Sequence, residues 1–173
     1  VYAIRTDTHN FEAGALDADV KAFQFLFPYA NMHLLSRIET AEMGLEELPY
    51  FQQALDNRRI RKGQIFSYLG RVRSHDTLVL VADFFMKCHQ VTWSVVFGID
   101  RKNLLVVIRN DGLRENAGSL ASKAFGAFGN AGGHRAMARA EIPLANLEGH
   151  LKEYDNATLS RLVIRQFETS ARK

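Results

Sequence analysis

Alternating apolar positions in the middle of the chain predict a pair of antiparallel strands. In residues 91–99 every second position carries a large apolar side chain, a period of two that is typical of a strand. The polar segment 100–103 is a turn signal, and the apolar segment 104–109 returns as the partner strand. Trp93 lies in the inward series of the first strand, so we expect it in the core.

Periodic patterns on both sides of this pair predict an α/β domain. Residues 64–72 alternate as a strand, and residues 74–89 follow with a helical pattern. Residues 117–128 predict a helix rich in small side chains, and residues 136–142 a further strand that ends at Pro143. The resulting order is strand–helix–strand–strand–helix–loop–strand, which predicts a mixed β-sheet with flanking helices but leaves the strand order open.

The first 45 residues have a pattern of their own. Residues 1–4 predict a short buried strand, and residues 17–27 a helix whose apolar residues face inward. Asn31 suits the N-cap of a second helix, with Leu34, Leu35 and Ile38 directed inward. The apolar stripe of these helices predicts core packing, or a surface that is left exposed or used in a homodimer.

The remaining helical patterns lie between the first 45 residues and the central domain, and after that domain. Pro49 suits the first turn of a helix that reaches about Arg59. Residues 144–154 and 157–169 predict two amphipathic helices, which we assign to packing or dimerisation. We therefore divide the chain into residues 1–45, a connecting helix at 46–62, a central domain at 63–143 and a C-terminal helical extension at 144–173.

Composition narrows the class of protein. With 173 residues, 47% hydrophobic and 24% charged, the chain is long and apolar enough for a real core. A net charge of +3 excludes a histone-like polycation, but the pI of about 9.1 permits local basic surfaces, and Arg58, Arg59, Arg61 and Lys62 form one. This basic segment is either a solvated face or a guide for a nucleic-acid strand or polyphosphate.

The cysteine content and the hydropathy bear on the cellular compartment. Cys88 is the one cysteine, which excludes an internal disulfide framework. The chain has no apolar run of 18 residues and no signal-like segment, so we expect a cytoplasmic protein without a membrane partner. It begins with valine in a strand-like pattern, from which we expect a piece of a longer polypeptide.

The segment 130–140 carries the clearest candidate chemistry. Gly132 and Gly133 let a ligand approach the backbone closely, and His134 and Arg135 follow at once. Backbone amides, an imidazole and a forked guanidinium together suit an anionic oxygen, above all that of a phosphate. A glycine turn followed by a chance His-Arg pair is the alternative interpretation.

The residues before this segment favour the phosphate site. An apolar strand ends in Arg109, a polar loop carries Arg114, and a small-residue helix leads to the Gly-Gly-His sequence. This order, over about Gln64 to Pro143, resembles the DHH-associated domain of DHH-family phosphoesterases, which include RecJ-like exonucleases, oligoribonuclease-type enzymes and exopolyphosphatase-related proteins. The resemblance implies that the strand-end arginine and the Gly-Gly-His loop hold the substrate's phosphate or terminal nucleotide. It assigns substrate binding to Arg109, Arg114, Gly132, Gly133, His134 and Arg135.

A second motif lies near the N-terminus. Asp7, in Thr6-Asp7-Thr8 followed two residues later by Phe11, resembles the last metal-ligand motif of the DHH catalytic domain. The resemblance implies that Asp7 binds one of two divalent ions, usually manganese, and that residues 1–45 are the tail of the catalytic domain. The Asp-His-His motif itself is absent from the sequence. Because a two-metal site needs several ligands, we expect the chain alone to be inactive and to need a DHH domain N-terminal to it.

These resemblances imply a function at two levels. The larger protein is expected to hydrolyse phosphodiester or phosphoanhydride bonds in short oligonucleotides, small nucleotides or polyphosphate, and this chain to bind the phosphate-containing substrate. The alternative is a non-catalytic nucleic-acid-binding module, because the same domain type occurs in alanyl-tRNA synthetases. A dimerisation scaffold with an incidental basic loop is a third interpretation.

Overall fold

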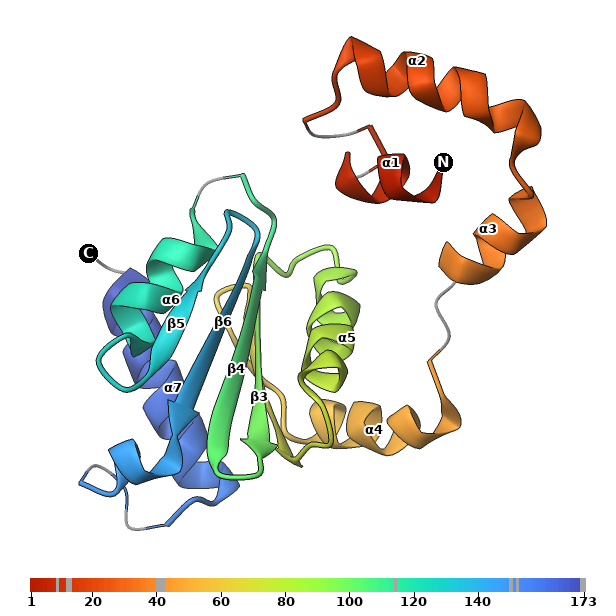
Figure 1. Ribbon diagram of the computed structural model, residues 1–173. Coiled ribbons are helices and arrows are strands. Elements are labelled where there is room, and N and C mark those ends of the chain that lie inside the picture. Colours follow the sequence, from red (N-terminus) through yellow and green to blue (C-terminus); the bar gives the residue numbers. More distant parts are fainter. Residues whose placement is uncertain are drawn as a thin grey trace. The chain divides into compact units, whose positions relative to one another are not determined.

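The computed structural model describes residues 1–8, 10–11, 14–39, 43–113, 115–149, 151 and 153–171. It divides the chain into two compact units, Val1–Leu45 and Glu46–Lys173, each of which is described by itself (Figure 1). Within the described residues, no helix is both long enough and apolar enough to cross a membrane.

The first unit is helical. Its elements are α1 (Tyr2–Asp7), α2 (Asp17–Leu26), the 3-10 turn η1 (Phe27–Tyr29) and α3 (Met32–Glu39). The expected strand over residues 1–4 is wrong, because the amides of Arg5 and Thr8 donate to carbonyls four residues back, at 3.1 Å each. A strand needs a partner to accept its backbone hydrogen bonds, and the described part of this unit contains no other strand. Asn31 caps α3 as predicted: its side chain accepts from the Leu34 amide at 3.0 Å.

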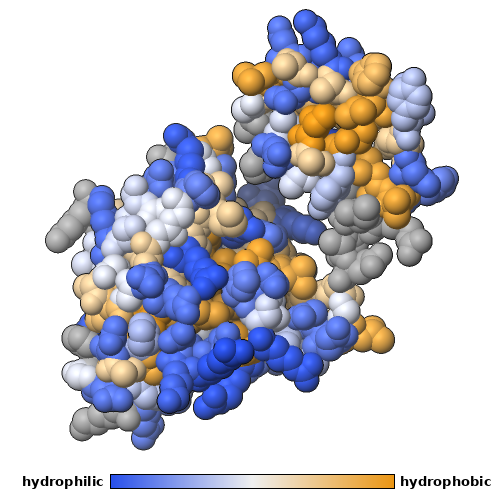
Figure 2. All heavy atoms as spheres, viewed as in Figure 1, coloured by the Kyte–Doolittle hydropathy of each residue, from blue (hydrophilic) through white to orange (hydrophobic). Residues whose placement is uncertain are grey.

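Much apolar surface of this unit is exposed. Of the side chains predicted to face inward, Leu35 is buried as predicted, whereas Leu34 is 52% exposed. Figure 2 shows an apolar cluster on the helices of this unit. The large exposed apolar side chains include Leu16, Val20, Phe25, Leu26, Phe27, Tyr29 and Met32. A small helical unit of this kind buries too little of its own apolar stripe to form a full core.

The second unit is built on a six-stranded mixed sheet with the order β1-β2-β3-β4-β6-β5. The pair β2–β3 is parallel, and the other neighbouring strands are antiparallel. The strands are β1 (Arg59–Arg61), β2 (Gln64–Arg71), β3 (Trp93–Asp100), β4 (Asn103–Asn110), β5 (Asn130–Gly133) and β6 (Met137–Pro143). The predicted α/β class, a mixed sheet with flanking helices, is confirmed.

Helices cover both faces of the sheet (Figure 1). One face packs against α4 (Leu48–Asp56) and α5 (His75–Met86), and the other against α6 (Ala117–Phe125) and α7 (Asn156–Ala171). Because both faces are covered, the central strands are buried throughout, and Trp93 is in the core as predicted, at 6% exposure.

Two shorter elements complete the second unit. The turn η2 (Leu45–Glu47) precedes α4, whose first turn contains Pro49 as predicted. The predicted helix over residues 144–154 is wrong, because the described residues contain only the 3-10 turn η3 (Leu144–Leu147). Arg59 is likewise not helical but begins the edge strand β1.

Candidate anion-binding site

The pairing of β4 with β6 brings the candidate residues together. Ile108 is opposite Ala138, and Arg109 is opposite Met137. The Gly-Gly-His segment immediately precedes β6, so it lies at the same end of the sheet as Arg109. Our hypothesis that the strand containing Ile108 neighbours the strand after Gly133 is confirmed.

The Gly-Gly-His segment is the tip of a β-hairpin and not an open loop. Gly132 and Gly133 are the last residues of β5, opposite Arg139 and Ala138 of β6. The His134 amide donates to the Met137 carbonyl at 2.7 Å and closes the turn. The hairpin therefore presents the His134 side chain, which is exposed to solvent, at its tip.

The two glycines meet different surroundings. A Cβ on Gly133 would lie 2.3 Å from the Met137 carbonyl oxygen, and Gly133 has φ of 155°. A Cβ on Gly118, in the first turn of α6, would lie 2.3 Å from the Gly133 oxygen. Around Gly132 the nearest atom would be Ser122 Oγ, at 3.7 Å. Close packing of helix on hairpin thus accounts for Gly133, whereas Gly132 leaves open space beside the backbone.

The amides at the start of α6 are occupied by the chain itself. Ala117 N donates to the Arg135 carbonyl and Gly118 N to the His134 carbonyl, both at 2.9 Å. Ser119 N donates to the Asn116 side chain at 3.0 Å, an N-capping contact. The first amides of α6 therefore hold the hairpin tip in place and are not open to an anion.

Arg135 is bound within the protein. Its Nε donates to the Gly112 carbonyl at 2.5 Å and its Nη2 to the Leu113 carbonyl at 2.9 Å. Asn110 stiffens the same loop, since its side chain donates to the Glu115 carbonyl and accepts from the Gly112 amide, at 2.9 Å each. These contacts favour a structural role for Arg135 over the substrate-binding role that the resemblance assigns to it.

Replacing Arg135 by alanine is expected to lower the free energy of unfolding by about 1–3 kcal/mol, because two charge-assisted hydrogen bonds are lost. Urea titration measures the change, and limited proteolysis of the loop at residues 111–116 reports its release. Arg139→Ala is the matched control, since the Arg139 guanidinium forms an exposed ion pair with Glu141 on its own strand. If both variants lose the same stability, Arg135 does not anchor the loop.

Arg109 is paired with an acidic residue that the sequence did not single out. Its Nε lies 2.7 Å from Asp83 Oδ1, and its Nη2 donates to Oδ2 at 3.1 Å, a two-point contact. The Arg109 side chain is 20% exposed. Asp83 is on α5, and no spacing along the chain relates it to Arg109. Only the packing of α5 on β4 brings the two together.

Two predicted site residues remain to be described, Arg114 and Asp7. Arg114 lies outside the described residues, although the loop that carries it begins beside Arg109. Asp7 is the exposed last residue of α1 and not the end of a strand. Among the described residues, no three or more histidine, cysteine, aspartate or glutamate side chains are grouped so as to hold a metal ion. A single exposed carboxylate does not fit a two-metal site.

Nearly the whole of this chain matches part of a solved structure. An exopolyphosphatase-related protein from Bacteroides fragilis superposes with a TM-score of 0.67 and 14% identity, covering 96% of this chain and 47% of that one. RecJ from Thermus thermophilus, in complex with Mn²⁺, is a weaker likeness, with a TM-score of 0.48, 15% identity and coverage of 98% and 23%. The first of these matches shows that the chain shares the fold of the exopolyphosphatase-related protein.

The sequence also has a relative in an archaeon. The uncharacterized protein MJ1633 of Methanocaldococcus jannaschii is 35% identical over 144 residues, which are 83% of this chain and 29% of that protein. The chain thus spans under a third of this relative and about half of the Bacteroides protein. No protein-family model matches the sequence.

Proposed function

We propose that the chain is the phosphate- or nucleotide-binding part of a larger phosphoesterase that acts on phosphodiester or phosphoanhydride bonds. The observation that carries the proposal is the convergence of Arg109, the loop at residues 110–116 and the His134 hairpin at one end of the sheet. The match to an exopolyphosphatase-related protein supports it at the level of the fold. The substrate class is an oligonucleotide, a small nucleotide or polyphosphate.

Each residue has a defined part in this proposal. The exposed His134 imidazole donates to a phosphate oxygen, and the open side of Gly132 lets that phosphate approach the backbone. Arg109 and Arg114 balance the remaining negative charge. Because Arg109 is held by Asp83, the ligand competes with this carboxylate for the guanidinium. Gly133 and Arg135 shape the site and do not touch the ligand.

Catalysis belongs to the larger protein. The resemblance to DHH-family enzymes implies divalent ions, with manganese the expected metal, but the described residues of this chain do not supply a site for them. We therefore assign this chain the positioning of the substrate, which holds a phosphate in a fixed place relative to a separate catalytic domain.

The test is binding of the chain to a dinucleotide, a mononucleotide and inorganic polyphosphate, measured by calorimetry. His134→Ala and Arg109→Ala are each expected to lower the affinity for the preferred ligand at least tenfold, which corresponds to about 1.4 kcal/mol of binding free energy. His89→Ala, which removes another exposed imidazole, is the matched control. Binding that is equal in all variants would refute the site.

Asp83→Asn separates a ligand role of Arg109 from a structural one. The substitution removes a competing negative charge and frees the guanidinium, so affinity for the anion is expected to rise several-fold. If Arg109 serves only to fix α5, the same variant lowers stability and leaves affinity unchanged.

A non-catalytic nucleic-acid-binding module is the second candidate. The position of Asp7 supports it. Asp7 lies in a helix and not at the end of a strand, where a metal ligand was expected. DHH motifs upstream in the encoded protein, and Mn²⁺-dependent hydrolysis by that protein, would favour the phosphoesterase. Binding of oligonucleotides by the larger protein without hydrolysis would favour the module.

A further inference from the structure

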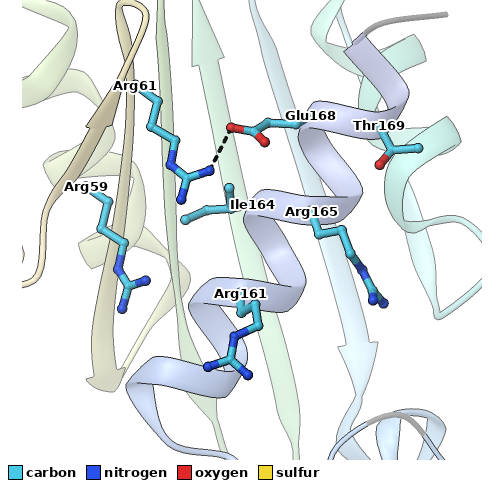
Figure 3. Close-up of a pocket in the computed structure, with 7 residues that line it drawn as sticks. All are labelled: Arg59, Arg61, Arg161, Ile164, Arg165, Glu168 and Thr169. Carbon is cyan, nitrogen blue, oxygen red and sulfur yellow. Dashed lines mark hydrogen bonds and ion pairs between the residues drawn. The ribbon is translucent and has the colours of Figure 1, made fainter.

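Four arginines surround a groove between the edge strand β1 and helix α7, away from the His134 hairpin. The groove encloses about 520 Å³ and is lined by Arg59, Arg61, Arg161, Ile164, Arg165, Glu168 and Thr169. Figure 3 shows Arg59 and Arg61 extending from the strand, and Arg161 and Arg165 from successive turns of the helix. The strand pair and the helix pair are at least 100 positions apart in the sequence, so the groove exists only in the folded chain.

The strand side of the groove follows from the two-residue period of β1. Arg59 and Arg61 project to the same face of the strand, while Ile60 between them projects to the other and is 62% exposed. Their sequence neighbours in the basic segment do not line the groove. Arg58 donates to the Leu55 carbonyl, and Lys62 is in the turn to β2 with φ of 48°.

The packing of α7 explains why its two arginines line the other side of the groove. Its inner face is buried against the sheet, which directs Arg161 and Arg165 outward. The two are four residues apart, so their charges lie on one face about 6 Å apart along the axis. Like charges at this spacing destabilise a helix slightly, and Arg59 and Arg61 across the groove add to the repulsion. An anion in the groove relieves it.

Acidic residues offset only part of this charge. Glu168 accepts from Arg61, with Nη1 and Oε1 3.2 Å apart. Hydrogen bonds from Thr158 hold the pKa of Asp155 below its ordinary value, and the Arg161 charge adds to this effect. In the part of the chain that the structure describes, Arg59, Arg161 and Arg165 have no carboxylate within ion-pair distance. Three guanidiniums are therefore available to a ligand.

The strand register relates the groove to the candidate anion-binding site. Arg61 is opposite Gln64, Gln64 is opposite Trp93, and Trp93 is opposite Asn110 at the end of β4. The Arg61 end of the groove is thus at the same end of the sheet as Arg109 and the hairpin. With neighbouring strands about 4.8 Å apart, β1 and β6 are separated by about 20 Å.

We propose that this groove binds the backbone of a single-stranded nucleic acid, at a second anion site distinct from the His134 hairpin. Arginine suits phosphate because its planar fork donates two hydrogen bonds, and its face stacks on bases. Successive phosphates of a nucleic-acid strand are separated by a sugar, so they lie farther apart than those of polyphosphate and suit arginines one helical turn apart. The Glu168 carboxylate repels a dense row of phosphates but accepts hydrogen bonds from base amino groups.

The test compares a dinucleotide with a single strand of about 12 nucleotides, long enough to cover such a site. In Arg161→Gln/Arg165→Gln, glutamine retains helix propensity and removes both charges. This variant is expected to bind the longer strand at least tenfold more weakly and the dinucleotide as before. The slope of log affinity against log salt concentration falls by about 1.4, because two phosphate contacts are lost. Fluorescence anisotropy measures both ligands.

Arg101→Gln/Lys102→Gln is the matched control, since it removes two charges from the β3–β4 turn at the opposite end of the sheet. The proposal would be overturned if both double variants lost the same affinity for the longer strand. It would also be overturned if the α7 variant lost as much affinity for the dinucleotide as for the longer strand. Tighter binding of inorganic polyphosphate, with the same loss in the α7 variant, would overturn the nucleic-acid assignment. Failure of the proposed function is a different result. In that case the His134→Ala variant binds the dinucleotide as tightly as the unchanged chain does.

Discussion

Gly133→Ala is expected to lower the free energy of unfolding by about 3 kcal/mol or more. The new methyl group would lie 2.3 Å from the Met137 oxygen and 2.5 Å from the Ala138 Cα, both backbone atoms of the paired strand. The φ of 155° is also one that residues with a side chain rarely adopt. No side chain can rotate to relieve this contact, so β5 must separate from β6. Urea denaturation of the variant measures the loss.

Gly132→Ala is the control one residue earlier. Its methyl group would have only Ser122 Oγ nearby, at 3.7 Å, so stability is expected to change by less than about 1 kcal/mol. If the backbone at Gly132 approaches a phosphate, this variant instead loses affinity for the ligand. Equal destabilisation by both alanines would contradict the assignment of Gly133 to packing and Gly132 to the open side of the site.

Phe167→Ala is expected to cost about 3–5 kcal/mol, the usual range for a fully buried phenylalanine. The Phe167 ring is 0% exposed and meets the Phe66 and Trp93 rings edge-on, with centroids 5.3 and 5.2 Å away. Its loss opens a cavity between α7 and two strands of the sheet. The shift of the thermal or urea midpoint measures the cost.

Two further variants keep this prediction testable. Phe167→Leu leaves a smaller cavity and is expected to lose less stability, so it reports on the site even if the alanine variant does not fold. Thr169→Ala, at an exposed position of the same helix, is expected to change little. If Phe167→Ala resembles Thr169→Ala, α7 does not contribute to the core of the second unit.

Local periodicity determined most elements of the second unit. The two-residue period of residues 91–99 and the polar turn at 100–103 specify the β3–β4 hairpin, because each strand buries its apolar side chains against the helices. Ser74 and Asn116 cap α5 and α6 through short contacts with their own helices. Such features depend on neighbours along the chain, so the sequence is sufficient to predict them.

Predictions failed where a segment lacked long-range partners or found unexpected ones. Residues 1–4 are apolar enough for a strand, but the described residues of the first unit offer them no strand to pair with, and residues 2–4 are helical instead. Arg59 and Arg61 follow a helix and carry charges, yet pairing with β2 makes them an edge strand. In both cases the presence or absence of a pairing partner outside the segment decides between two local conformations of similar free energy.

The sequence by itself determined the α/β class, the main helices and strands of the second unit, and the residue types of the proposed phosphate site at one end of a strand. Only the tertiary structure decided what these residues contact: Asp83 for Arg109, and backbone carbonyls of the neighbouring loop for Arg135. It also assembled the groove of Arg59, Arg61, Arg161 and Arg165. The physical reason is that strand order and helix packing set distances between residues far apart in the chain, and no periodicity encodes those distances.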